Sequence, residues 1–399
     1  MTLNFRNYLT VTGGYWAFTL TDGAIRMLVV LYFHQLGYSP LEVASLFLFY
    51  EFFGIITNMV GGWLAARVGL NVTMHIGMAL QVFALLMLTV PDIWLSIIYV
   101  MIAQALSGIA KDLNKMSAKA SVKTLVSGSD KNSDARLFKW VALLTGSKNT
   151  LKGAGFFLGA FLLAVFDFRT ALLILAGSLF IVLLITLWLL PRQLGKSKSK
   201  PKFTQIFSNS AAINYLSAAR FFLFGARDIW FVVALPVFLY DVLGWSFTQT
   251  GSFIALWIIG YGVIQASAPK LLNIKKEAPD AKAIHFWGGL LLLIPIGIAL
   301  ALSQAWNKEL VLVIGLIIFG VIFALNSALH SYLILAYSQQ DKVALKVGFY
   351  YMANAGGRLT GTMLSGWGYL QFGLQGCLWM SAGFVFMAFL LSLALPTND

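Results

Sequence analysis

The chain has 399 residues, of which 59% are hydrophobic and only 11% are charged, and its mean hydropathy is +0.81. An ordinary soluble domain carries about 25% charged residues, so this composition excludes a soluble globular protein. The net charge is +13, but the basic residues do not alternate with aromatic residues on a soluble fold. We therefore expect no nucleic-acid partner. The single cysteine, Cys377, excludes an internal disulfide bond and a thiolate metal cluster.

Apolar windows recur along the whole chain at the length of about 20 residues that a helix needs to cross a bilayer. Six windows precede the basic stretch that begins at Pro191, at residues 11–33, 41–64, 72–91, 94–116, 137–165 and 170–190. Six more follow it, at residues 212–240, 247–268, 283–303, 310–333, 345–369 and 372–394. The sequence therefore predicts an all-α membrane protein with twelve transmembrane helices.

The two groups of six spans carry matching motifs at a nearly constant separation. The tetrapeptide LGYS at 36–39 recurs as LGWS at 243–246, an offset of 207 residues. Ala176-Gly177 recurs as Ala382-Gly383 at an offset of 206. Because transporter folds are commonly built from internal repeats, this offset predicts two pseudo-symmetric six-helix bundles. The predicted division is residues 1–190, a basic cytoplasmic linker at 191–208, and residues 209–399.

Basic residues in the predicted loops indicate the orientation in the membrane. Nineteen Lys and Arg residues fall on one predicted face, including those of the 115–139 loop, and two, Arg169 and Lys308, fall on the other. Cytoplasmic loops hold the excess of Lys and Arg, so we expect both termini in the cytoplasm and the protein in the cell (inner) membrane. Of the 28 basic residues, the remaining seven fall inside predicted spans.

The arrangement of six plus six spans with a basic central loop resembles the major facilitator superfamily. The usual loop signature of that family after the second span is present in degraded form at Gly62–Gly69. The position of its Asp is occupied by Ala66, so a gating contact that depends on this carboxylate is in doubt.

Charged residues inside the predicted spans are the candidate site. Each costs roughly 2.5 to 3.5 kcal/mol at a helix centre unless it is paired or hydrated, so we expect these residues to face an internal cavity. The predicted cations are Arg26, Lys111, Lys148, Lys152, Arg220, Arg227 and Arg358, and the predicted carboxylates, candidate groups for proton or charge coupling, are Asp22, Glu51, Asp112 and Asp228.

Helical spacing and charge balance indicate an anionic cargo. Lys148 and Lys152 lie one turn apart on one helix face, so their like charges repel each other. This arrangement is favourable only when an anion binds between them. Seven cations minus four carboxylates leave a surplus of +3. The guanidinium group binds oxyanions in bidentate fashion, so Arg26 and Arg227, on equivalent helices, are predicted to hold one oxyanion. Lys148, Lys152 and Arg358 are predicted to hold another.

Structural interpretations of the same residues stay open. Asp22 with Arg26, one turn apart, and Arg227 with Asp228 could be pairs that lock helices together. Lys111 and Asp112 could extend to the membrane surface, and Glu51 could be a protonated core carboxyl. Asn326 and His330, also predicted as substrate ligands, could instead form hydrogen bonds between helices.

Longer motifs resemble one particular family. These are NYLTVTGGYW at 7–16, TLTDG at 19–23 with Arg26, FHQLGYSP at 33–40, KDLNK at 111–115 and KNTLKG at 148–153. With them the chain resembles the ArsJ-type organoarsenical efflux permeases from end to end. The resemblance implies export of 1-arseno-3-phosphoglycerate, arsenate resistance, and a glyceraldehyde-3-phosphate dehydrogenase as functional partner.

The main alternative is an importer or antiporter of phosphorylated three-carbon metabolites. A multidrug exporter would suit the 12 Trp and 32 Phe residues, but seven cations within the spans disfavour a lipophilic cation as cargo. No grouping of His, Cys and Asp in the spans indicates a membrane hydrolase or transferase. We therefore expect no enzymatic activity, no cofactor and no resident metal, and we expect a monomer whose partners are the lipid bilayer and a small anion.

Overall fold

A computed structural model of the chain describes residues 3–38, 43, 46–126, 133–191, 202–207, 210–272, 279–304, 306–339 and 342–397. These residues are almost entirely helical, and no strand occurs among them. The predicted all-α fold class is therefore confirmed.

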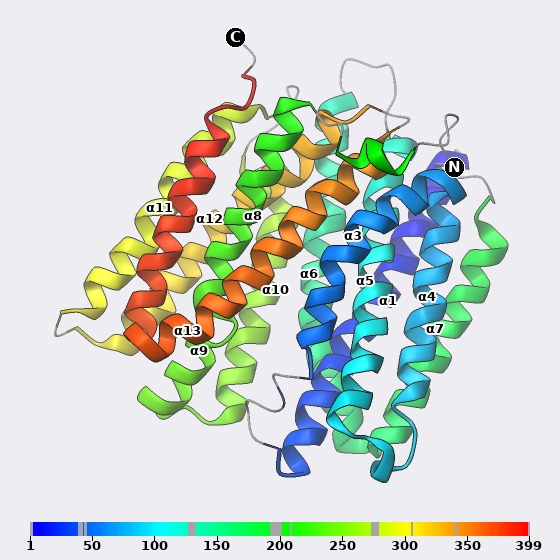
Figure 1. Ribbon diagram of the computed structural model, residues 1–399, viewed down its shortest axis with the longest axis horizontal. Helices are drawn as coiled ribbons and strands as arrows, with labels where there is room; N and C mark the ends of the chain where they lie inside the picture. Colours follow the sequence, from blue (N-terminus) through cyan, green and yellow to red (C-terminus); the bar gives the residue numbers. More distant parts are fainter. Residues whose placement is uncertain are drawn as a thin grey trace. The chain divides into compact units, whose positions relative to one another are not determined.

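The long helices reproduce the predicted spans in order (Figure 1). The first six are α1 (Leu3–Gln35), α3 (Leu48–Val68), α4 (Leu70–Met87), α5 (Ile97–Val126), α6 (Ser133–Val165) and α7 (Phe168–Leu189). The later ones are α8 (Ala211–Phe231), α10 (Phe247–Leu271), α11 (Ala281–Leu302), α12 (Lys308–Ala336) and α13 (Val343–Ser392). Short turns lie between them: η1 (Asp92–Trp94), η2 (Phe203–Ile206), α9 (Ala234–Val237) and the π-helical turn η3 (Phe238–Val242).

Helix α13 contains the last two predicted spans. Its backbone is non-helical at Gly373, where φ is 65° and ψ is −168°. Only glycine adopts such a positive φ without a steric penalty from Cβ. One long element therefore divides into two membrane-crossing lengths, as the sequence predicted.

Nine segments of the described chain are long and apolar enough to cross a membrane by length and composition. Helices α5 and α6 are not among these nine, because polar and charged residues lower their hydropathy. With α5, α6 and the second part of α13, the described helices supply the twelve predicted spans. Some of these charged residues, among them Lys111, Asp112 and Lys152, belong to the candidate site described below.

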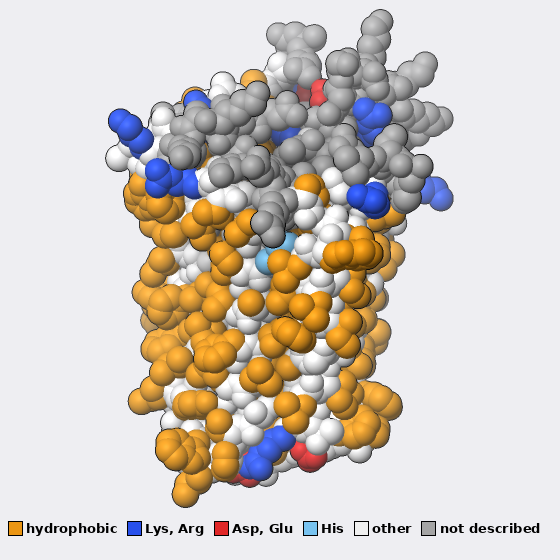
Figure 2. Space-filling model, turned by 90° about the vertical axis from the view of Figure 1, so that its right-hand side faces the viewer, with side chains coloured by type: hydrophobic (Ala, Val, Ile, Leu, Met, Phe, Trp, Pro, Cys, Tyr) orange, Lys and Arg blue, Asp and Glu red, His pale blue; other side chains and the backbone are white. Residues whose placement is uncertain are grey.

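The lipid-facing surface is apolar. Helix α7 leaves Leu173, Phe180, Ile181 and Trp188 exposed, with 86% of Trp188 accessible. Figure 2 shows hydrophobic side chains covering the middle of one face, with Lys and Arg side chains near its ends. This distribution fits a bilayer around the middle of the helices and water at their ends.

Contacts divide the chain into two compact units. Unit 1 consists of Met1–Ser133, Ser147–Ser208 and Ser338–Met352, and unit 2 consists of Asp134–Gly146, Asn209–Tyr337 and Ala353–Asp399. The first part of α6 thus belongs to unit 2, and the first part of α13 belongs to unit 1. The predicted division into residues 1–190, 191–208 and 209–399 stays a prediction.

Each unit has its own apolar core. In unit 1, Leu28, Phe33, Leu85 and Leu172 are fully buried together. In unit 2, the core is aromatic and is built around Trp230, whose ring centroid lies 5.1 Å from that of Phe319 and 5.7 Å from that of Trp257.

One predicted loop is shorter in the structure than the sequence suggested. The sequence placed residues 115–139 in a loop, but α5 continues to Val126, and Lys115 and Lys119 lie buried on it. Both lysines pack against Tyr351, whose ring lies 4.4 Å from Lys115 Nζ and 5.1 Å from Lys119 Nζ. Several predicted loop positions, namely Lys131, residues 192–201, Lys275 and Lys276, lie outside the described residues.

Candidate functional site

Unit 1 contains a first cluster of charged side chains on four helices. It consists of Asp22 and Arg26 of α1, Tyr50 and Glu51 of α3, Lys111, Asp112 and Lys115 of α5, and Lys152 of α6. Both oxygens of the Asp22 carboxylate have partners. The Tyr50 hydroxyl donates to Oδ1 at 2.7 Å, and Lys152 Nζ lies 3.3 Å from Oδ2.

The partner of Arg26 lies on another helix. The sequence left open that Asp22 and Arg26, one turn apart, form a pair, but Arg26 Nη2 lies 3.7 Å from Glu51 Oε1. Asp22 turns toward α6 instead, where Lys152 offers an ion pair between helices. Glu51, which could have been an isolated core carboxyl, is therefore beside a cation.

Lys111 lies over an aromatic ring. Its Nζ is 3.8 Å from the centroid of the Tyr50 ring and 3.8 Å from Asp112 Oδ2. Asp112, which is 2% exposed, also accepts a hydrogen bond from Lys115. Only 11% of the Lys111 side chain is accessible, so this lysine is held inside the unit rather than extended to the surface.

Glycines allow these helices to approach closely enough for the pairs to form. A Cβ atom on Gly155 would lie 2.6 Å from the Leu20 carbonyl oxygen and 3.0 Å from Gly23 Cα. The first distance is shorter than Cβ contacts in real proteins and the second is tighter than most of them, so only glycine fits where α6 crosses α1. This crossing brings Lys152 within reach of Asp22.

Lys148 lies one turn before Lys152 on α6 and is partly exposed. The predicted repulsion between these lysines is reduced because Lys152 has Asp22 as its counter-ion.

Unit 2 contains a second cluster of three arginines and one carboxylate: Arg220, Arg227, Asp228 and Arg358. Asp228 is fully buried, and each of its oxygens accepts from an arginine. Arg227 Nε donates to Oδ1 at 2.6 Å, and Arg358 Nε donates to Oδ2 at 3.0 Å. The predicted pair of Arg227 with Asp228 is thus present, and α13 adds a second arginine to it.

Arg220 is 2% exposed and has a neutral hydrogen-bond network around it. Its Nε donates to Asn354 Oδ1 at 2.9 Å, and its Nη1 donates to Ser327 Oγ at 3.1 Å. Tyr261 and Gln265 of α10 both donate to the same Ser327 hydroxyl at 3.1 Å. Sequence reasoning missed these four polar partners, because single Ser, Asn, Tyr and Gln residues are common in membrane helices.

The two clusters repeat one arrangement. Asp22 and Asp228 are 206 residues apart, as are Lys152 and Arg358. In each unit the carboxylate pairs with a cation from the equivalent later helix, Lys152 in unit 1 and Arg358 in unit 2. The equal offset of the two aspartates was the signal that could have predicted both pairs.

The charges do not cancel within either cluster. In the first cluster, four cations face three carboxylates, which leaves +1. In the second cluster, three arginines face one carboxylate, which leaves +2. The carboxylates are the more buried partners: 14% of the Arg227 side chain and 24% of the Arg358 side chain are accessible, against none of Asp228. The arrangement can therefore present positive charge to an anion.

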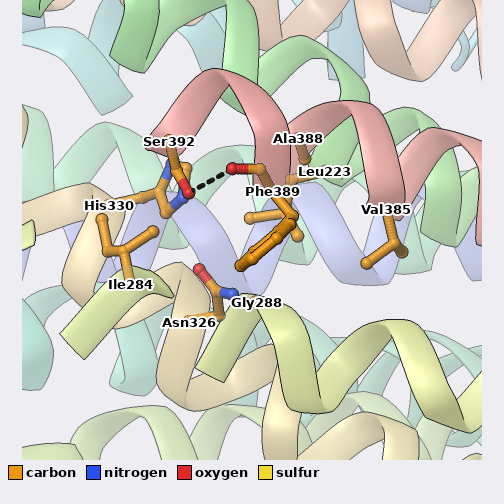
Figure 3. Close-up of a pocket in the computed structure, with 9 residues that line it drawn as sticks. All are labelled: Leu223, Ile284, Gly288, Asn326, His330, Val385, Ala388, Phe389 and Ser392. Carbon is orange, nitrogen blue, oxygen red and sulfur yellow. Dashed lines mark hydrogen bonds between the residues drawn. The ribbon is translucent and has the colours of Figure 1, made fainter. Parts of the chain in front are cut away.

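Asn326 and His330 line a different place in unit 2. They lie one turn apart on α12 and line a pocket of about 10 Å³ together with residues of α8, α11 and α13 (Figure 3). Within the described part of the chain, Asn326 Oδ1 and His330 Nδ1 have no hydrogen-bond partner. Ligand pockets usually measure about 300 to 1,000 Å³, so this pocket fits ordered water better than a metabolite.

Comparisons with known proteins agree with this architecture. The family model described as Major Facilitator Superfamily matches residues 11–332. The structure of the human organic anion transporter MFSD10 (TETRAN) superposes with a TM-score of 0.78 at 17% identity, over 98% of this chain and all of that one.

Two further transporter structures are similar. One is the proton:xylose symporter XylE bound to 6-bromo-6-deoxy-D-glucose, with a TM-score of 0.77 at 15% identity over 98% of this chain and 96% of that one. The other is a bacterial homologue of the iron transporter ferroportin in an outward-facing state, with a TM-score of 0.74 at 15% identity over 98% and 99%. At these identities the likeness shows the fold alone. A search of curated protein sequences finds no match.

Proposed function

The chain belongs to the Major Facilitator Superfamily and is a multi-pass membrane transporter, and we propose that its cargo is an organic oxyanion that leaves the cytoplasm. The specific cargo that we propose is 1-arseno-3-phosphoglycerate, whose export would confer resistance to arsenate. The choice of an arsenic compound rests on the resemblance of the sequence motifs to ArsJ-type permeases. The two charged clusters support only that the cargo is an anion.

The observation that carries the proposal is the surplus of arginine around Asp228. One fully buried carboxylate accepts from two arginines, whose side chains are 14% and 24% accessible. Two positive charges beside one negative charge are costly inside a membrane protein. A visiting oxyanion would offset that cost, and arginine suits it because its planar fork binds tetrahedral oxyanions through two parallel hydrogen bonds.

The membrane potential favours export. An inside-negative potential drives each negative charge outward with about 2.3 kcal/mol per 100 mV. A cargo with two or more negative charges therefore needs no further energy source to leave the cell. Uptake of the same anion would require a coupled proton or a counter-anion. Asp22, Glu51, Asp112 and Asp228 are the carboxylates that could provide such coupling.

The proposal includes the cellular setting. Both termini are expected in the cytoplasm of the inner membrane, and the transporter is expected to act as a monomer. A glyceraldehyde-3-phosphate dehydrogenase that accepts arsenate would supply the cargo in the cytoplasm.

An arsenate-sensitive host tests the proposal. The transporter should raise the tolerated arsenate concentration when it is expressed together with the dehydrogenase, and not when either is expressed alone. An Arg358→Gln variant should reach the membrane without conferring resistance, because Arg227 still pairs with Asp228. Equal resistance with and without the dehydrogenase would contradict the proposed cargo.

The second candidate is exchange of phosphorylated three-carbon metabolites. The same clusters support it, because phosphate and arsenate have similar charge and geometry. Proteoliposomes loaded with phosphate separate the candidates. Rapid uptake of labelled 3-phosphoglycerate against internal phosphate indicates an antiporter, whereas transport that depends only on an imposed potential indicates the proposed exporter.

A further inference from the structure

Tyr50 occupies the centre of the first cluster. Its side chain is 2% exposed, and three cations lie near its ring. The distances from the ring centroid are 3.8 Å to Lys111 Nζ, 5.1 Å to Arg26 Cζ and 5.8 Å to Lys152 Nζ. The hydroxyl of the same residue donates to Asp22. A single neutral side chain thus contacts cations from α1, α5 and α6.

The backbone around Tyr50 is built for this position. A Cβ atom on Gly108 of α5 would lie 2.5 Å from the Tyr50 carbonyl oxygen and 3.0 Å from its Cα. Glycine therefore allows α5 to touch α3 at this residue. Lys111 follows Gly108 by three residues, about one helical turn, so the same contact brings its ammonium group over the ring.

An aromatic ring stabilises cations in a way that a carboxylate does not. The negative face of the ring attracts a cation electrostatically but adds no negative charge to the cluster. Asp22, Glu51 and Asp112 each cancel one cation, whereas Tyr50 holds cations in place and leaves the net positive charge available. Phe224 has the same relation to Arg220 and Arg227 in unit 2, at 3.8 Å and 5.0 Å.

We propose that Tyr50 is a positioning residue for anion binding: its ring holds Lys111 and Arg26 ready for the cargo, and its hydroxyl keeps Asp22 turned toward Lys152. The inference rests on the proposed anion transport. Without the ring, Lys111 and Arg26 would settle more tightly against Asp112 and Glu51. The anion would then have to break these ion pairs, and its affinity would fall.

The experiment separates the ring from the hydroxyl. Purified Tyr50→Phe and Tyr50→Leu variants are reconstituted in liposomes, and KM and kcat are measured with 3-phosphoglycerate. The Phe variant should raise KM roughly threefold through loss of the Asp22 contact, and the Leu variant should raise it roughly tenfold or more. In both, kcat should stay within about twofold of the parent, because neither change removes a charge. Tyr99→Leu, which removes a ring whose hydroxyl donates to the Met87 carbonyl, serves as the control and should leave KM unchanged.

A second series keeps the proposal testable where the Leu variant does not fold. Phenylalanine with zero, one, two or three ring fluorines is incorporated at position 50, since fluorine weakens the negative ring face with little change of shape. KM should rise stepwise with fluorine number. A flat series overturns the proposal, as does an equal KM in the Phe and Leu variants. Failure of the parent protein to transport either 3-phosphoglycerate or 1-arseno-3-phosphoglycerate would instead contradict the proposed anion transport.

Discussion

Removing Arg358 tests the second cluster most directly. Arg358 Nε donates to Asp228 Oδ2 at 3.0 Å, while Arg227 holds the other oxygen. Arg358→Gln removes one of two charge-assisted hydrogen bonds from a fully buried carboxylate. A hydrogen bond to a charged group contributes roughly 1.5 to 3 kcal/mol, so we expect a stability loss of about 2 kcal/mol. Because Arg227 still pairs with Asp228, the variant should fold.

The effect on anion binding should be larger than the effect on stability. The change lowers the net charge of the second cluster from +2 to +1. A unit charge about 5 Å from the anion contributes roughly 3 kcal/mol at an effective dielectric constant of about 20. This corresponds to an affinity loss of about 100-fold. Arg358→Lys keeps the charge but loses the planar fork, so its affinity should fall by only about tenfold.

Binding of 3-phosphoglycerate to the purified protein, measured together with the thermal midpoint, provides the assay. Arg169→Gln is the matched control, because Arg169 forms an exposed pair with Asp92 at 3.4 Å. Such surface pairs contribute about 0 to 1 kcal/mol, and anion affinity should not change. A folded Arg358→Gln protein with parental affinity would refute the assignment of the second cluster to the anion.

Two further predictions concern packing and a helix cap. Gly155→Val should destabilise the protein by about 3 kcal/mol in a thermal unfolding assay, because the valine side chain would collide with the backbone of α1 at Leu20. Gly177→Ala is the control. It should be neutral in the same assay, because nothing lies within 4 Å of the added Cβ. Asp167→Ala should lower the thermal midpoint but leave transport unchanged, because the carboxylate caps α7 by accepting from the Thr170 backbone N–H at 2.9 Å. Hydrogen bonds from Thr170 lower the pKa of Asp167, so the parent should lose this stabilisation as the pH falls through the acidic range, and the Ala variant should show no such loss.

Much of the architecture could be predicted from the sequence because the bilayer imposes a length on every span. Apolar windows of about 20 residues predicted each long helix, and the regular offset of 206 to 207 residues predicted two repeated groups of six spans. The cost of a charge in lipid also made the candidate residues recognisable. A cation within a span needs a partner, and the structure provides one for Arg26, Lys152, Arg227 and Arg358.

The sequence by itself determined which residues would need partners, but only the tertiary structure decided which partners they have. Spacing along one helix favoured an ion pair between Asp22 and Arg26. The close crossing at Gly155 instead places Lys152 of α6 beside Asp22, and Arg26 pairs with Glu51. The central position of Tyr50 has no signature in the sequence, because it depends on three helices meeting at one ring. Contacts between helices depend on crossing geometry, and the pattern of residues along a single helix does not contain it.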